Sequence, residues 1–316
     1  MSSFEQPFAM VFPGQGSQSV GMGKELANTS AMAAEMFSQM DQAVGFALST
    51  VMFEGDAAQL SDTIHTQPAL YTHSLACYLV IQGSYGKLPT YVAGHSLGQL
   101  SASVAAGALG FADGLKLVVT RGQLMKKAGE KNPGSMAAIL GLDIPLLEAV
   151  CLESSADGKV VQVANDNCQG QVVISGHKEA VDAACVAAKA AGAKRALPLA
   201  VSIAAHSLLM DSIQEEWNAA VDSYDFSAPT IPVIGNVSAR PLVTAVEIKN
   251  DLKLQMQSRV RWTESINWLK SNNISKYIET GNGAVLAGLI KRIDPDALVK
   301  PASNPAEIAS LLEELR

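Results

Sequence analysis

The sequence predicts a mixed α/β protein in which a large domain with a parallel β-sheet carries a smaller inserted domain. Short apolar runs such as "AMVF" and "YVAG" are typical of strands that are buried on both faces, as in parallel sheets. Longer segments with apolar residues three and four positions apart separate these runs and predict helices. Between residues 135 and 201 the predicted order becomes β-α-β-β-α-β, which is the pattern of a ferredoxin-like unit.

The large domain is expected to comprise residues 1–131 and 203–316, and the inserted domain residues 132–202. Before the insertion, the predicted elements are a strand at 7–12, a helix at about 22–41, a helix from Pro68, a strand at 90–94, a helix after Ser96 and a helix at about 112–128. Pro68 is placed at a helix start because proline is well tolerated in the first turn.

The insert and the rest of the large domain follow the same reasoning. In the insert, strands are expected at 136–142, 159–166, 171–176 and 194–201, with helices at 144–155 and 178–192. After it come a helix beyond His206, a strand at 231–237, a helix at 262–272, a strand at 276–281 and a final helical stretch.

The composition supports a large core and excludes several classes of function. Of the 316 residues, 48% are hydrophobic, and the formal net charge of -7 argues against a general nucleic-acid-binding protein. No apolar run reaches the roughly 18 residues that a membrane-spanning helix needs. The four cysteines include no C-x-x-C pair, so neither a zinc site nor a disulfide framework is expected. We expect a cytoplasmic protein without a metal site or a signal peptide.

The segment "GHSLG", Gly94 to Gly98, places a serine between two glycines at a predicted strand-to-helix turn. In such an elbow the serine hydroxyl projects from a strained backbone, and the helix N-terminus offers amides to a developing oxyanion. Many G-x-S-x-G matches are ordinary turns. Because this match lies between a predicted strand and a predicted helix, Ser96 is predicted to be a nucleophile, with a helix-capping serine as the alternative.

A serine nucleophile requires a base, and the chain has five histidines. His95 lies inside the elbow, so its side chain is expected to point away from the Ser96 hydroxyl. His206 ends the apolar run "LPLAVSIAA" and precedes a predicted helix, where a neutral imidazole is favoured. His206 is the candidate base, and a packed turn histidine is the alternative.

Arg121 shares the apolar stripe of its predicted helix with Leu117 and Leu124. An arginine in such a stripe is unfavourable unless its head meets an anion or reaches water. Arg121 is thus either a rim residue with an exposed head or a fork that binds a substrate carboxylate.

The stretch "FPGQGSQSVGMGKEL" contains a glycine-rich turn after the first predicted strand. A Walker-type phosphate loop would need lysine and then serine or threonine where Met22 and Gly23 stand, and the spacing also misses G-x-G-x-x-G. The turn can instead bring a backbone amide to an active serine.

Together these segments resemble the malonyl-CoA:acyl carrier protein transacylase family of bacterial fatty-acid synthesis. The likeness covers almost the whole chain and rests on "VFPGQGSQSVGMGKEL", "TQPAL", "GHSLG", "TRGQLM", "GSMAAILGL", "GQVVISG", "GAKRALPL", "VSIAAHSLLM", "RVRW" and "ETGNGAVL". It implies an α/β-hydrolase-like core with a ferredoxin-like insert. It also implies ping-pong transfer of malonyl from malonyl-CoA to the phosphopantetheine thiol of acyl carrier protein, without a cofactor.

The resemblance implies a role for each candidate residue. Ser96 corresponds to the nucleophile, His206 to its base and Arg121 to the arginine that binds the malonyl carboxylate. Gln255 corresponds to a glutamine that helps to orient the histidine, and carbonyl oxygens replace a triad aspartate. The implied oxyanion hole consists of the backbone amides of Gln15 and Leu97.

The carrier partner is acidic in this family, whereas the chain itself has a net charge of -7. A local basic patch is therefore expected to overcome the overall repulsion. The candidates for this patch are Lys194 and Arg195 at the end of the insert, followed by Lys291 and Arg292. A monomer is expected.

The chain departs from the family pattern near both candidate catalytic residues. Gln99 follows "SLG" where the family usually has glutamate, and Ser207 replaces a frequent cysteine. Ala205 stands beside His206 where related enzymes often carry a larger side chain or serine, so a substituted malonyl group could fit.

Two other functions are compatible with parts of the pattern. A hydrolytic serine esterase or thioesterase would use the same nucleophile, but it would normally have Ser…Asp/Glu…His order with a dedicated carboxylate. A non-catalytic carrier-binding module would not need Ser96, His206, Arg121 and Gln255.

Overall fold

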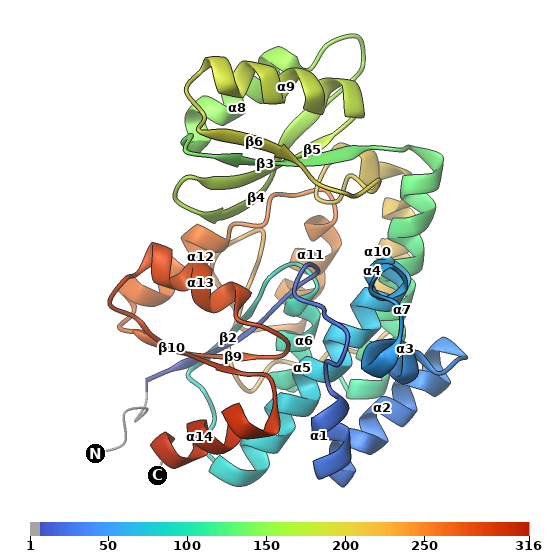
Figure 1. The fold of residues 1–316 in the computed structure, drawn as a ribbon, viewed down its shortest axis with the longest axis vertical. Helices are drawn as coiled ribbons and strands as arrows, with labels where there is room; N and C mark the ends of the chain where they lie inside the picture. Colours follow the sequence, from blue (N-terminus) through green and yellow to red (C-terminus); the bar gives the residue numbers. More distant parts are fainter. Residues whose placement is uncertain (1–6, 316) are drawn as a thin grey trace.

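The computed structural model describes residues 7–315, and within them the chain forms two β-sheets surrounded by helices (Figure 1). Residues 1–6, which bear on the signal-peptide expectation, and residue 316 lie outside the described residues. The strands are β1 (Ala9–Phe12), β2 (Tyr91–Gly94), β3 (Ser135–Leu140), β4 (Val161–Cys168), β5 (Gln171–Gly176), β6 (Arg195–Pro198), β7 (Val233–Ile234), β8 (Pro241–Leu242), β9 (Lys276–Thr280) and β10 (Leu298–Ala302).

Helices of very different length connect and cover these strands. They are α1 (Lys24–Thr29), α2 (Ala31–Val44), α3 (Leu48–Glu54), α4 (Ala57–Ser61), α5 (Thr63–Tyr85), α6 (Gly98–Ala105), α7 (Phe111–Lys131), α8 (Ile144–Ser154), α9 (Lys178–Ala190), the 3-10 helix η1 (Leu208–Ile213), α10 (Gln214–Asp222), α11 (Ala245–Gln255), α12 (Trp262–Ser271), α13 (Val285–Ile293) and α14 (Pro305–Leu315).

The larger sheet has the strand order β10-β9-β1-β2-β7-β8. All neighbours in it are parallel except β7 and β8, which are antiparallel. Strand β1 is buried along its whole length, as its unbroken apolar run predicts. Because β1, β2 and β7 are adjacent and parallel, the segments that follow them meet at one edge of the sheet, where open α/β sheets place their ligands.

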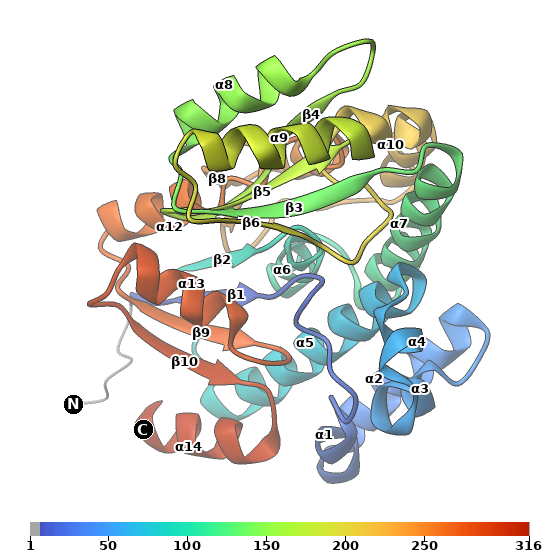
Figure 2. The ribbon, with the colours of Figure 1, turned by 45° about the horizontal axis from the view of Figure 1, so that its top comes forward.

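The smaller sheet is antiparallel and has the strand order β4-β5-β3-β6. Both views show α8 and α9 on its outer face, and its other face lies toward the larger sheet (Figures 1 and 2). One hydrophobic core joins these two helices to the sheet, and a separate small cluster of Met136, Ala164 and Val173 packs with Ala205 on the opposite face. The chain order β-α-β-β-α-β agrees with the expected one.

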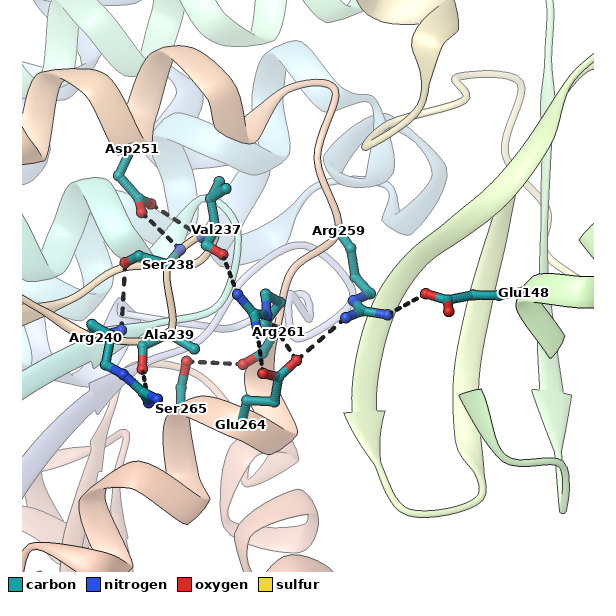
Figure 3. Close-up of polar contacts among 10 residues, drawn as sticks. All are labelled: Glu148, Val237, Ser238, Ala239, Arg240, Asp251, Arg259, Arg261, Glu264 and Ser265. Carbon is teal, nitrogen blue, oxygen red and sulfur yellow. Dashed lines mark hydrogen bonds and ion pairs between the residues drawn. The ribbon is translucent and has the colours of Figure 1, made fainter. Parts of the chain in front are cut away.

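Strand β4 joins the smaller sheet to the rest of the molecule. The amide of Val260 donates to the carbonyl of Ala164 at 2.8 Å, and the amide of Asp166 donates to the carbonyl of Val260 at 2.9 Å. Arg259 reinforces this junction because it forms ion pairs with Glu148 on α8, at 2.7 Å, and with Glu264 on α12, at 3.3 Å (Figure 3).

Two helix predictions require correction. The helix expected at 22–41 is two helices, because Ser30 has an extended backbone (φ -131°) and its side chain caps α2 at the amide of Ala33. Helix α5 begins at Thr63 rather than near Pro68, because Asp62 caps it by accepting from the amide of Ile64 at 3.2 Å. Pro68 thus lies inside the helix and removes one of its hydrogen-bond donors.

The final helical stretch that the sequence predicts after residue 281 also contains a strand, β10. Its sequence "LVKPA" includes Lys300 and Pro301, which weaken the strand pattern. Strand β10 lies at the edge of the larger sheet, where a proline is tolerated.

Candidate active site

Ser96 occupies a sharp turn between β2 and α6. Its φ angle is +51°, in the left-handed region that residues other than glycine rarely adopt. The flanking glycines permit the turn, because a Cβ on Gly94 would lie 2.0 Å from the backbone of Gly98, and a Cβ on Gly98 would lie 2.0 Å from the carbonyl oxygen of Phe12. The predicted strand-turn-helix elbow is therefore present, and close backbone packing accounts for both glycines.

His206 meets the Ser96 hydroxyl directly. The Ser96 Oγ lies 2.8 Å from His206 Nε2, and His206 Nδ1 lies 2.8 Å from the carbonyl oxygen of Gln255. A carbonyl can only accept, so Nδ1 carries the proton and Nε2 accepts from the serine hydroxyl. This is the tautomer that a general base requires, and a carbonyl stands where a triad would have a carboxylate.

Two factors keep His206 neutral at pH 7. Burial, followed by the nearby Arg121 cation, lowers the pKa of His206 to about 3. The backbone that carries this side chain is unusual as well, because the φ angle of His206 is +58°, in the left-handed region. Ser96 is not the capping residue of α6, since Leu97 occupies that position, and the ring of His206 contacts the Ser96 hydroxyl directly.

Arg121 lies in the same site with its head buried. It is 1% exposed, so the interpretation as a rim residue with a hydrated head is wrong. Its Nη atoms donate to Gln67 Oε1 at 2.9 Å, to Gln255 Oε1 at 2.9 Å and to Ser96 Oγ at 3.0 Å. Within residues 7–315 its Nε has no hydrogen-bond partner and no carboxylate forms an ion pair with it. Burial lowers the pKa of Arg121 to about 10, so it remains a cation at neutral pH.

The side chain of Gln255 connects the arginine to the elbow. Its Oε1 accepts from Arg121, while its Nε2 donates to the carbonyl of Ser96 at 3.0 Å and to Gln99 Oε1 at 2.6 Å. The family resemblance implies that Gln255 helps to orient His206. The contact that reaches the His206 ring is made by the main-chain carbonyl of Gln255.

The glycine-rich turn after β1 lies against the elbow. A Cβ on Gly14 would approach the carbonyl oxygen of His95 to 2.5 Å, so glycine is required for this contact. Among residues 7–315, the amides of Gln15 and Leu97 have no hydrogen-bond partner in the protein. The His95 ring points away from the hydroxyl of Ser96, as expected, and its Nε2 lies 2.9 Å from Asn167 Oδ1.

The comparisons with known proteins agree with this geometry. A family model described as "Acyl transferase domain" matches residues 9–287. The chain belongs to the acyl transferase family. A curated relative from Salmonella typhimurium, named malonyl CoA-acyl carrier protein transacylase, is 43% identical over 307 residues, which cover 97% of this chain and 99% of the relative.

Solved structures of acyl transferases resemble this one closely. A malonyl CoA-acyl carrier protein transacylase from Coxiella burnetii has a TM-score of 0.94 at 39% identity and covers 98% of both chains. Another structure, described as a type II PKS acyl-carrier protein in complex with its malonyl-transacylase, has a TM-score of 0.94 at 40% identity over 98% of this chain and 99% of that one.

Two residues of the acyl transferase site were missed by the sequence analysis although a signal was present. Asn236 follows β7 as Ser96 follows β2, and its Oδ1 accepts from the Ser96 amide at 2.7 Å. Its position after a neighbouring parallel strand could have identified it. Gln67 lies in the motif "TQPAL", and only its contact with Arg121 indicates what it does in the site.

The smaller sheet also contributes to the site of the acyl transferase, which the sequence did not indicate. Gln162 on β4 donates to the carbonyls of His206, at 3.2 Å, and Gln257, at 3.0 Å, and it accepts from the amide of Leu208 at 3.2 Å. Gln162 therefore joins the segment that carries His206 to the segment that carries Gln255.

Three of the four residues of the predicted basic patch lie together. A surface pocket between the smaller sheet and α13 is lined by Leu140, Gly141, Gln169, Gly170, Gln171, Lys194, Arg195 and Arg292. Lys291 does not line this pocket, and its Nζ donates to the carbonyl of Pro295 at 3.2 Å. Among the described residues, no cluster of three or more metal-binding side chains is found, and none of the helices has the length and apolar character needed to cross a membrane.

Proposed function

We propose that this acyl transferase moves the malonyl group from malonyl-CoA to the phosphopantetheine thiol of acyl carrier protein, through a malonyl ester on Ser96. The observation that carries the proposal is the buried Arg121 cation, which lies 3.0 Å from the Ser96 hydroxyl and has no carboxylate partner among the described residues. A malonyl thioester brings a carboxylate close to the carbonyl that the serine attacks. The curated relative bears the name of this activity.

The first half-reaction forms the ester on Ser96. His206 Nε2 accepts the hydroxyl proton while Ser96 Oγ attacks the thioester carbonyl, and the backbone amides of Gln15 and Leu97 bind the oxyanion. One such donor contributes about 3–4 kcal/mol to transition-state stabilisation. The C–S bond then breaks, and the imidazolium returns its proton to the CoA thiolate.

The second half-reaction uses the same groups in the opposite direction. The carrier thiol gives its proton to His206 and attacks the ester carbonyl, and Ser96 leaves and regains a proton from the imidazolium. The Arg121 guanidinium holds the malonyl carboxylate throughout with parallel hydrogen bonds. These steps require neither a metal nor a redox cofactor.

A hydrolytic esterase is the second candidate, and one contact argues against it. The partner of His206 Nδ1 is the carbonyl of Gln255, at 2.8 Å, whereas an esterase of this architecture normally uses a dedicated carboxylate. The buried Arg121 is also unnecessary for hydrolysis of a neutral acyl ester.

The proposal extends to the architecture. It assigns residues 1–131 and 203–316 to an α/β-hydrolase-like core and residues 132–202 to a ferredoxin-like insert. The strand order β4-β5-β3-β6, with both helices on one face, supports the second assignment. The working unit in this proposal is a monomer in the cytosol.

The proposed function is tested by intact-mass measurement in two steps. After mixing with malonyl-CoA, the protein is expected to gain the mass of one malonyl group, and addition of the phosphopantetheinylated carrier should remove it and create malonyl-carrier. Parallel incubations with methylmalonyl-CoA and acetyl-CoA measure selectivity for the acyl group. Release of free malonate without malonyl-carrier would identify a hydrolase, and the absence of any adduct would favour a non-catalytic module.

The basic pocket is expected to bind the acidic carrier. The double variant Lys194→Glu/Arg195→Glu should raise the KM for the carrier by about tenfold or more and weaken its dependence on salt, because opposite charges steer association. The KM for malonyl-CoA should change little. Initial rates at several ionic strengths measure both effects.

A matched control is Lys131→Glu/Lys189→Glu, which changes the net charge equally at exposed positions outside the pocket. If this control raises the carrier KM as much, net charge rather than the pocket is responsible. An equal rise in the KM for malonyl-CoA would instead indicate that Lys194 and Arg195 bind the phosphates of CoA.

A further inference from the structure

A buried carboxylate that the proposed reaction does not use lies behind the elbow. Asp251 is 5% exposed and stands four residues before Gln255 on α11. Its Oδ1 accepts from the amide of Asn236 at 2.9 Å. Figure 3 shows its contacts with the next two residues, in which Oδ1 accepts from the amide of Val237 at 3.3 Å and Oδ2 from the amide of Ser238 at 3.1 Å. Within residues 7–315 it forms no ion pair, so backbone and amide donors alone stabilise its charge.

The loop after β7 is shaped around this carboxylate. A Cβ on Gly235 would lie 2.4 Å from Asp251 Oδ2, so only glycine allows the close approach. The loop in turn supports the elbow, because the side chain of Asn236 accepts from the Ser96 amide and donates to the carbonyl of Gly94, both at 2.7 Å. Asp251 therefore bonds directly to Asn236, the residue whose side chain holds the strained backbone of Ser96.

Asp251 also orients the side-chain amide of Gln99, which contacts Gln255. Gln99 Nε2 donates to Asp251 Oδ1 at 2.8 Å, which leaves Gln99 Oε1 to accept from Gln255 Nε2 at 2.6 Å. Gln255 Nε2 donates to Gln99 and to the carbonyl of Ser96, and Gln255 Oε1 accepts from Arg121 at 2.9 Å. A carboxylate only accepts, whereas an amide can be turned end for end, so Asp251 fixes the orientation of Gln99. Gln99 Oε1 and the carbonyl of Ser96 are then both acceptors for Gln255 Nε2.

We propose that Asp251 is a positioning residue for acyl transfer. It holds the loop that supports Ser96, and through Gln99 it keeps an acceptor opposite the Nε2 of Gln255, the glutamine whose Oε1 accepts from the Arg121 cation. Without this acceptor the amide of Gln99 can reverse, and its NH2 group would then face Gln255 Nε2, so the glutamine that contacts Arg121 would lose one of its supports. The inference rests on the proposed function, since it concerns the same serine and arginine.

The test compares three variants in single-turnover formation of the malonyl ester. Asp251→Asn should lower the rate by about 10- to 100-fold at saturating malonyl-CoA, because small displacements of reacting groups have effects of this size. Gln99→Glu should also be slower, because it places a second carboxylate beside Asp251. The double variant Asp251→Asn/Gln99→Glu restores the hydrogen bond between the two side chains with its direction reversed. It should recover only part of the rate, because the NH2 group introduced by Asp251→Asn would also face the amides of Asn236 and Val237.

Recovery in the double variant separates positioning from a general loss of stability. The matched control is Asp294→Asn, because Asp294 is a buried carboxylate (2% exposed) that pairs with Lys270 away from the site. This control should lower the melting temperature without changing the rate of ester formation. A wild-type rate in folded Asp251→Asn, or a folded double variant no faster than Asp251→Asn, would overturn the proposal.

A further variant keeps the inference testable if Asp251→Asn does not fold. Gln99→Met removes the side-chain amide that connects Asp251 to Gln255, and it leaves the backbone donors of the loop in place. It should slow formation of the malonyl ester at least tenfold, and a wild-type rate would overturn this role of Gln99. If the wild-type protein itself formed no malonyl ester, the proposed function would fail, and that result is distinct from every outcome for Asp251.

Discussion

Ser96→Ala is expected to form no malonyl adduct, and its transfer rate should fall by about 10⁶-fold, as for removal of the nucleophile from other serine hydrolase-type sites. The variant removes the only hydroxyl that lies within hydrogen-bond distance of His206 Nε2 among the described residues. The measurement is intact mass after incubation with malonyl-CoA, supported by the rate of malonyl-carrier formation.

Ser101→Ala is the matched control for this variant, since Ser101 is a buried serine on α6, the helix that follows the turn of Ser96, and its hydroxyl has no partner among the described residues. It should acquire the malonyl group normally. An adduct of unchanged yield on Ser96→Ala would show that another residue is the nucleophile.

Arg121→Ala is expected to reduce malonyl transfer by roughly 30-fold to several thousand-fold in kcat/KM, because removing one partner of a buried charge pair costs about 2–5 kcal/mol. Acetyl transfer should be spared or improved, since the acetyl group has no carboxylate to pair. Arg121→Lys should recover only part of the malonyl activity, because an ammonium cannot form the two parallel hydrogen bonds of a guanidinium. Formation of the acyl ester from both thioesters measures the difference.

The contrast between the two substrates is the control for folding in the Arg121 experiment. A variant that is damaged as a whole would lose malonyl and acetyl transfer together. Equal losses in a protein with a normal melting temperature would mean that Arg121 supports Gln67 and Gln255 structurally and that the carboxylate is bound elsewhere.

The elbow and its histidine could be predicted because their signals are local. Two glycines around a serine, between an apolar run and a helical pattern, describe the turn almost completely, and the close contacts at Gly94 and Gly98 account for it. Arg121 could be singled out because a charged residue in an apolar stripe requires an explanation. The choice between a rim residue and a buried fork needed the three-dimensional position of its head.

The supporting contacts could not be predicted because they join segments that are distant in the sequence. Gln162 and Asp251 carry no local pattern, and each acquires its partners only when a second or third segment packs beside it. The error at Pro68 has a different origin, since the capping interaction of Asp62 outweighs the usual position of proline. At β10, the edge position permits a proline that the strand pattern disfavours.

The contacts of Gln162 have a consequence for the order in which the protein becomes active during folding. Ser96 and His206 are 110 positions apart, and the smaller sheet lies between them in the sequence. Contacts between residues so far apart in the sequence form late in folding, because closing the long loop between them first costs conformational entropy. Because Gln162 joins the segments of His206 and Gln255, we expect Ser96 and His206 to align only after the smaller sheet has docked. Recovery of activity during refolding should therefore lag behind recovery of helical structure, which makes enzymatic activity a sensitive report of complete folding.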